Sequence, residues 1–135
     1  MRVFLDTNVL VSAFATRGLS SDVVHLVLAE HELVTGETNL SELRRVLQDR
    51  IGLPHGEVRA VEELIRGQTV VPRPDQAPEI EIRDPDDRWV LASAIAGAAD
   101  ILVTGDKDLL SVAEQFAIPI VNPRGFWERV RREPG

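Results

Sequence analysis

The chain has 135 residues, of which 44% are apolar and 27% charged, as expected for one soluble domain spanning residues 1–135. It has no cysteine, no apolar run of the ~18 residues that a membrane span needs, and no signal-peptide pattern, so we expect a cytoplasmic protein without disulfides or a membrane anchor. The net charge of −7 argues against nucleic-acid binding through a broad basic surface.

Short strand-like runs alternate with helical patterns along the chain. In order, the pattern predicts a strand at 2–5, a helix from about Asn8, a helix at 20–32 capped by Ser20 or Ser21, a strand at 33–35, helices at 38–50 and 55–67, a strand at 69–71, a proline-rich loop at 72–85, a helix at 86–99, a strand at 101–104, a helix at 106–116, a strand at 118–121 and a helix at 124–132. This alternation favours a three-layer α/β/α fold of Rossmann type, with a central parallel sheet of four to five strands.

Acidic residues follow the ends of two predicted strands. Asp6 comes directly after the first strand, and Asp106 comes just after the fourth. Ligands of parallel sheets bind beyond the carboxyl ends of the strands, so the two carboxylates would face one crevice if these strands are neighbours. Each aspartate could instead be a helix N-cap, and Asp108 a first-turn acid favoured by the helix dipole.

Further acids lie at the starts of two predicted helices. Glu42 lies on the flank of an apolar helical face, and residues 84–87 (DPDD) hold three acids where a cap needs one. Two carboxylates about 5 Å apart repel each other by roughly 3 kcal/mol at an effective dielectric constant of 20. Four of them in one pocket would therefore favour a bound cation, and ligands that are all oxygen suit one or two Mg²⁺ or Mn²⁺ ions. Such ions can promote phosphodiester displacement by water.

Several segments together resemble the PIN domain, in particular the PIN-family toxin component of prokaryotic toxin–antitoxin pairs. They are FLDTNVLVSAF, SELRRVL, DPDDRWVLASAIAGAADILVTGDKDLL and IPIVNPRGFW, and they occur in the family's order over nearly the whole chain. The resemblance implies an α/β/α ribonuclease that uses Mg²⁺ or Mn²⁺. By position, the catalytic and metal-binding acids would be Asp6, Glu42, Asp87 and Asp106.

The resemblance also implies further residues and partners. Thr7, Asn8 and Thr104 would brace the first acid, and Asp84 and Asp108 would be auxiliary metal ligands. Family members are often homodimers and are often silenced by a small antitoxin whose arm enters the acidic crevice. From their chemistry, Arg88, Lys107 and Arg124 are candidates for holding the RNA backbone, with ordinary surface charge as the alternative.

Two other functions remain open from the sequence. The fold could be a catalytically silent partner-binding module. It could also be a haloacid-dehalogenase-like phosphohydrolase with a nucleophilic aspartate. Those enzymes usually have a second aspartate two positions on, whereas this chain has Asn8 there. The Phe126–Trp127 pair could be an interface patch, but we expect it to close the core.

Overall fold

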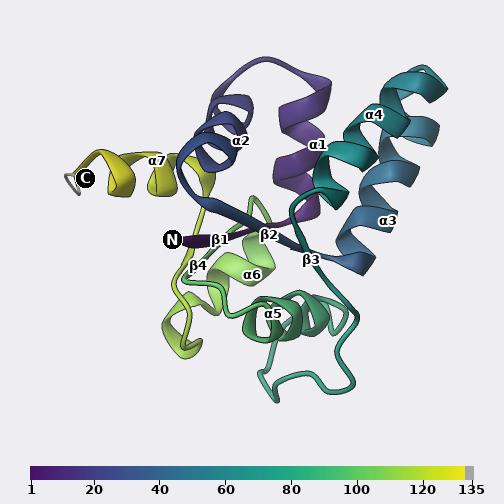
Figure 1. The fold of residues 1–135 in the computed structure, drawn as a ribbon. Helices are drawn as coiled ribbons and strands as arrows, with labels where there is room; N and C mark the ends of the chain where they lie inside the picture. The colour runs from purple at the N-terminus through teal and green to yellow at the C-terminus, as the bar shows by residue number, and fades with distance from the viewer. Residues whose placement is uncertain (133–135) are drawn as a thin grey trace.

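The computed structural model describes residues 1–132 as a parallel β-sheet covered by helices on both faces (Figure 1). The elements in chain order are β1 (Arg2–Leu5), α1 (Thr7–Ala15), α2 (Leu19–Glu30), β2 (Glu32–Gly36), α3 (Glu37–Arg45), the π-helical turn η1 (Val46–Ile51), α4 (His55–Arg66), β3 (Thr69–Val71), α5 (Asp87–Ala96), β4 (Ile101–Val103), α6 (Lys107–Ser111), the 3₁₀ turn η2 (Ala113–Gln115), β5 (Ile120–Val121) and α7 (Pro123–Arg132). The predicted α/β class, with a parallel sheet between helices, is confirmed.

The sheet has five parallel strands in the order β3-β2-β1-β4-β5. The chain builds outward from β1 in one direction and then crosses to β4 on the other side, so the topology reverses between β1 and β4. These two strands are in register, with Leu5 opposite Val103. The segments that follow them therefore leave the sheet side by side, which confirms the neighbouring strands on which the predicted crevice depends.

Side chains alternate between two apolar cores, one on each face of the sheet. Val3 and Leu5 of β1 face the core under α1, α2, α3, α4 and α7, whereas Phe4 faces the core under α5 and α6. Figure 1 shows α1–α4 on one side of the sheet and α5 and α6 on the other. Both faces are covered, so most strand residues are apolar. Phe126 of α7 is fully buried in the first core and Trp127 packs against it, as expected.

Three predicted helix boundaries were wrong for identifiable reasons. Helix α2 begins at Leu19 after Gly18, so Ser20 and Ser21 lie inside it, and no side chain of the described residues caps it. The helix predicted at 38–50 changes to a π-helical turn after Arg45. The helix predicted at 106–116 stops at Ser111 and gives way to a 3₁₀ turn. Apolar spacing locates a helix, but tertiary packing sets its ends and its winding.

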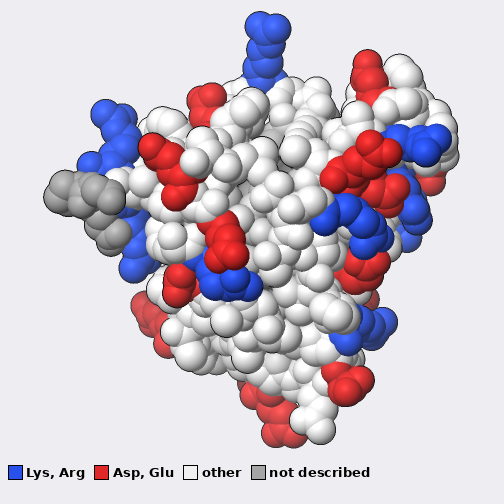
Figure 2. Space-filling view, viewed as in Figure 1, with Lys and Arg blue, Asp and Glu red and all other residues white. Residues whose placement is uncertain are grey.

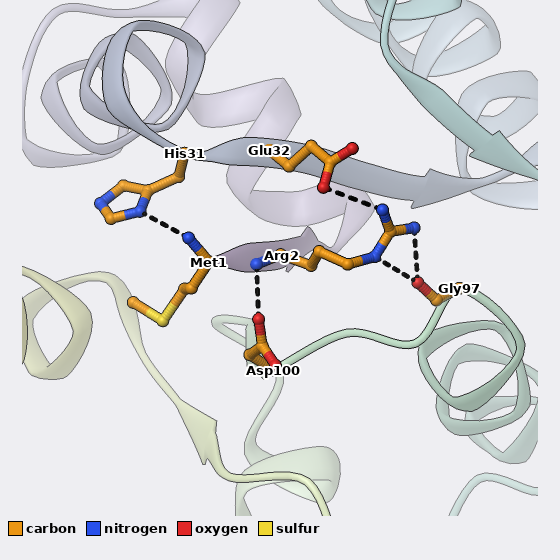
Figure 3. Close-up of polar contacts among 6 residues, drawn as sticks. All are labelled: Met1, Arg2, His31, Glu32, Gly97 and Asp100. Carbon is orange, nitrogen blue, oxygen red and sulfur yellow. Dashed lines mark hydrogen bonds and ion pairs between the residues drawn. The ribbon is translucent and has the colours of Figure 1, made fainter.

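Arg2 fixes the start of β1 to two neighbouring segments (Figure 3). Its guanidinium donates two hydrogen bonds to the Gly97 carbonyl oxygen, at 2.9 and 2.7 Å, and one to Glu32, at 2.9 Å. Its backbone N–H donates to Asp100 at 2.7 Å. These contacts join β1, β2 and the α5–β4 connection at the edge of the sheet opposite to Asp6. Among residues 1–132, no helix has the length and apolar character needed to cross a membrane.

Gly97 lies where α5 approaches the sheet too closely for any side chain. A Cβ there would lie 2.7 Å from Val34 Cγ1 and 2.8 Å from Val71 Cγ2.

We predict that Gly97→Ala lowers the free energy of unfolding by about 1–3 kcal/mol, because the two valines must move. Gly56→Ala in α4 is the matched control, since its Cβ would meet nothing within 4 Å. It should stabilise the protein by about 0.5–1 kcal/mol. Urea denaturation of both variants measures the difference, and equal stabilities would contradict this packing.

Candidate active site

A cleft of about 830 Å³ opens at the carboxyl ends of the strands, between α1, α3, η1 and α5. All four acids that the sequence singled out line it: Asp6, Glu42, Asp87 and Asp106. Asp6 comes from the end of β1, Glu42 from α3, Asp87 from the start of α5, and Asp106 from the loop after β4. The parallel sheet brings these four segments to one edge, because each follows a strand or begins a helix there.

Asp6 is almost fully buried and accepts four hydrogen bonds. Its Oδ1 accepts from the Thr7 backbone N–H at 2.8 Å and from Asn39 Nδ2 at 3.0 Å. Its Oδ2 accepts from Asn8 Nδ2 at 3.1 Å and from the Thr104 hydroxyl at 2.7 Å. Burial raises the pKa of Asp6, while the bonds from Thr104, Thr7 and Asn8 lower it and the charge of Asp106 raises it again. Because all four partners donate, the site is built around the ionised carboxylate.

Thr104 and Asn8 connect Asp6 to the loop that carries Asp106. The Thr104 hydroxyl oxygen accepts the Asp106 backbone N–H at 3.0 Å, which leaves its proton for Asp6. Asn8 Oδ1 accepts the Gly105 backbone N–H at 2.7 Å. Thr7, Asn8 and Thr104 therefore lie beside Asp6, where the resemblance places them. Asp6 also caps α1, and Asp106 caps α6 by accepting from the Asp108 N–H.

Asn39 is a buried neighbour of Asp6 that the sequence analysis missed. Besides its bond to Asp6, its Nδ2 donates to the Thr7 hydroxyl at 2.9 Å. Asn39 precedes Glu42 by three positions, so both lie on one face of α3, and this spacing was the available signal. The preceding Gly36 leaves room for it, since a Cβ at Gly36 would lie 2.7 Å from Asn39 Oδ1.

Asp87 carries the clearest mark of missing positive charge in the cleft. Its Oδ2 is buried and has no hydrogen-bond partner among the described residues. The pKa of Asp87 is raised to about 7. The largest cause is burial, followed by the charges of Asp106 and Asp84, a hydrogen bond shared with Asp106, and the charge of Asp6. A buried carboxylate without a partner is costly. Asp87 therefore requires either a proton or a cation.

Glu42 lies at the exposed rim of the cleft, yet it is influenced by the other acids. Partial burial of its carboxyl raises its pKa, the charge of Asp6 raises it further, and Arg45 lowers it. Asp6 thus acts electrostatically on both Glu42 and Asp87, and Asp106 acts on Asp6. The four acids form one electrostatic group even though they come from four separate segments.

The two auxiliary acids differ from each other. Carboxylate oxygens of Asp87, Asp106 and Asp108 lie within 4.8 Å of one another. Asp108, however, is paired with Arg83, whose Nη2 lies 2.8 Å from it, and this pairing lowers the pKa of Asp108. Asp84 lines the cleft and accepts the Asp86 backbone N–H at 3.0 Å, so it satisfies the turn before α5. One acid of DPDD thus serves the turn, which leaves Asp87 free to face the cleft.

A family model described as the PIN domain matches residues 2–108. The chain belongs to the PIN domain family. PIN domains are typically nucleases and generally use divalent metal ions. The comparison with curated proteins gave no match.

Three solved structures share the fold of this PIN domain at low sequence identity. VapBC2 from Rickettsia felis, in a structure with a DNA fragment from its promoter, has a TM-score of 0.63 at 15% identity, covering 90% of this chain and 98% of that one. FitAcB from Neisseria gonorrhoeae has a TM-score of 0.59 at 16% identity, with the same two coverages. PAE2754 from Pyrobaculum aerophilum has a TM-score of 0.62 at 16% identity, covering 98% of this chain and 91% of that one.

The basic residues that line the cleft of this PIN domain are not those that the sequence suggested. Arg88 donates from Nε to the Ile80 carbonyl at 2.9 Å and so holds the proline-rich loop, and Lys107 and Arg124 are exposed outside the cleft. The cleft is lined instead by Arg45, Arg50 and Arg73.

The π-helical turn explains why the sequence pattern missed Arg50. On an α-helix, residues five apart point about 140° away from each other, so Arg45 and Arg50 would face different sides. A π-helix has i→i+5 hydrogen bonds and a wider turn, so side chains five positions apart point closer to one side than on an α-helix, and Arg45 and Arg50 both line the cleft. The wall of the cleft opposite α5 therefore carries basic side chains, next to apolar ones such as Val46 and Ile51.

Figure 2 shows Lys and Arg interspersed with Asp and Glu on the face that it views, apart from basic side chains along α7 at the left.

The residues of the cleft fit a hard divalent cation. The acids offer carboxylate oxygens alone, which Mg²⁺ and Mn²⁺ prefer. Asp87 Oδ2 has no hydrogen-bond partner among the described residues, and a bound cation would satisfy this oxygen. Asp6 and Asp106 are held in place by hydrogen bonds from the protein, so their positions do not depend on the ion.

The raised pKa of Asp87 predicts how stability depends on pH. The folded protein holds this proton up to about pH 7, whereas the unfolded chain releases it near the ordinary aspartate pKa of 3.8. Stability from this group therefore falls as the pH rises between these values, by about 2 kcal/mol after allowance for solvent screening. Asp87→Asn should remove this loss, and Asp75→Asn, an exposed loop acid, should not. Urea denaturation at about pH 5 and pH 8 without divalent cations measures it. Identical pH dependence in both variants would contradict the shift.

Proposed function

We propose that this PIN domain is a metal-dependent endoribonuclease that hydrolyses phosphodiester bonds of RNA. The observation that carries the proposal is that the cleft holds both a fixed, buried carboxylate, Asp6, and Asp87, whose unpartnered oxygen and raised pKa are satisfied by a proton or a cation. Perturbed acids gathered in a cleft favour a catalytic site over a structural ion-pair network. The family to which the chain belongs supports nuclease chemistry.

In this proposal the four acids hold one or two Mg²⁺ or Mn²⁺ ions. Asp6, Glu42, Asp87 and Asp106 are the catalytic acids and the ligands, and Asp84 is an auxiliary ligand within reach of the cleft. Asp108 is a weaker candidate, because Arg83 already neutralises it. When bound, such an ion supplies a Lewis acid that stabilises charge developing on the phosphate oxygens.

The residues of the chain then have separate tasks. Thr7, Asn8, Asn39 and Thr104 orient Asp6 through hydrogen bonds. One of the four carboxylates, within hydrogen-bond reach of the attacking water, orients that water and accepts its proton. Arg45 and Arg50 hold phosphates of the RNA on the opposite wall. They replace Arg88, Lys107 and Arg124 in this task.

We also propose that the enzyme is the toxin of a toxin–antitoxin pair. The sequence resemblance to PIN-family toxins supports this role, and the likeness to VapBC2 and FitAcB is compatible with it. A small antitoxin with a basic arm would complement the acidic cleft by charge. A homodimer and a cytoplasmic location, where RNA is abundant, complete the proposal. Copurification with the small protein encoded in the neighbouring reading frame tests the pairing.

The alternative is a catalytically silent partner-binding module, which an RNA cleavage assay distinguishes from an enzyme. Such a module would bind cations and a partner but would leave RNA intact under every metal condition. The haloacid-dehalogenase-like alternative is set aside, since the chain belongs to the PIN family and Asn8 donates to Asp6 rather than acting as a second acid.

Removal of a single acid tests the nuclease proposal. We predict that Asp6→Asn and Asp106→Asn each lower the rate of RNA cleavage about 100-fold or more, and that EDTA abolishes cleavage by the wild-type protein. Purified proteins and a labelled RNA, with Mg²⁺ or Mn²⁺ added back, measure this. Asp75→Asn is the matched control and should cleave at the wild-type rate.

Asp6→Asn places an amide among four donors and is expected to destabilise the fold, so the more accessible Asp106→Asn gives the independent measurement. Wild-type cleavage by both variants would refute the proposal, because the activity would then come from a contaminating nuclease.

The proposed phosphate contact of Arg50, in place of Lys107, gives a separate prediction. Arg50→Gln should weaken RNA binding about equally for all sequences and reduce the salt dependence of log Kd by about one unit, as expected for one lost phosphate contact. Lys107→Gln, a change of equal charge outside the cleft, should alter neither quantity. A titration of binding against salt concentration decides between them, and a larger effect of Lys107→Gln would reverse the assignment.

A further inference from the structure

Arg73 and Trp89 form a stacked pair on the wall of the cleft, and the metal-site proposal leaves this pair unexplained. The Arg73 guanidinium carbon lies 4.5 Å from the centroid of the Trp89 ring, and both side chains line the cleft. Arg73 lies just after β3, at the start of the proline-rich loop. Trp89 lies in the first turn of α5, two residues after Asp87. The aromatic ring of Trp89 thus lies on the same helix segment as Asp87, one of the proposed catalytic acids, and the cation of Arg73 reaches it from the loop after β3.

The cleft is larger than its acids and one or two ions need. Its volume of about 830 Å³ falls in the range of roughly 300–1,000 Å³ that accommodates organic ligands. Asp6 and Asp106 follow the neighbouring strands β1 and β4, whereas Arg73 follows β3, which is separated from β1 by β2. Space for a nucleotide beside the scissile phosphate is therefore lined by the stacked pair.

We propose that Trp89 and Arg73 form a stacking subsite for one unpaired base of the RNA, next to the bond that is cut. This inference rests on the proposed ribonuclease function. Every base has a π-face that stacks on tryptophan and on a planar guanidinium, so the subsite would tolerate all four bases. A base within a duplex is already stacked and paired, so the subsite selects single-stranded or looped RNA.

A purely structural role makes different demands on the same pair. If Arg73 serves to hold the proline-rich loop against α5, as Arg88 does through Ile80, its loss would lower stability without affecting the choice of ligand. A phosphate-binding role for Arg73 alone would weaken binding of any polyanion equally. Of these three roles, only a base-stacking subsite distinguishes RNA with bases from the same backbone without them.

Binding of two matched ligands to two proteins tests the subsite. The ligands are a short single-stranded oligoadenylate RNA and an abasic ribose-phosphate chain of the same length. Affinities are measured by fluorescence anisotropy with Ca²⁺, which suits oxygen ligands, in place of Mg²⁺. Wild-type protein should bind the oligoadenylate about tenfold more tightly than the abasic chain. Trp89→Leu should lose this preference while keeping its affinity for the abasic chain, and Trp89→Phe should retain most of it.

Controls separate the alternatives. Trp127→Phe, in α7, should keep the wild-type preference, and Arg73→Lys should keep the affinity for the abasic chain while reducing the preference. Equal preference in the wild type and in Trp89→Leu would overturn the subsite, and so would a wild type that does not distinguish the two ligands.

The same proteins and oligoadenylate, assayed for cleavage with Mg²⁺ or Mn²⁺, separate this inference from the proposed function. If the wild type prefers oligoadenylate over the abasic chain but does not cleave it, the nuclease proposal is refuted and the subsite stands. If it cleaves oligoadenylate without preferring it, the subsite is refuted and the nuclease proposal stands. A wild type that does not bind RNA would refute both.

Discussion

The structure of the site depends on how a carboxylate can be buried at the edge of a parallel sheet. Asp6 is only 5% exposed, and a charge at that depth is costly unless several donors surround it. The chain supplies those donors from three directions, through Thr7 and Asn8 of α1, Asn39 of α3 and Thr104 after β4. These bonds fix the relative positions of the three segments that carry Asp6, Glu42 and Asp106.

The same arrangement leaves an unbalanced charge. The donors around Asp6 are neutral, so they hold its charge without cancelling it, and the neighbouring acids experience it. Asp87 responds with a pKa of about 7 and an oxygen that no described residue bonds. Arg45 offsets part of the charge at Glu42, and the neighbouring acid Asp108, outside the four, is paired with Arg83. The protein thus pays stability at neutral pH to keep four carboxylates together, which natural proteins do mainly at functional sites.

The walls of the cleft have a different chemistry from the group of acids. Arg45 and Arg50 reach the cleft because a π-helical turn follows α3, and Arg73 reaches it because the loop after β3 folds back toward α5. An acidic floor with basic and aromatic side chains on the wall suits a ligand that carries phosphates and bases together. The net charge of −7 argues against nucleic-acid binding through a broad basic surface, but it does not exclude a few arginines in one cleft.

The sequence by itself determined what depends on local spacing. The alternation of strands and helices, the position of Asp6 and Asp106 just after β1 and β4, and the acids in α3 and at the start of α5 follow from periodicity and caps, which act over a few residues. Only the tertiary structure decided what depends on distant neighbours. It paired β1 with β4, so that Thr104 bonds Asp6 across 98 residues, and it brought Asn39 beneath Asp6. It also wound the end of α3 into a π-turn and raised the pKa of Asp87, because packing and burial, rather than spacing along the chain, set both.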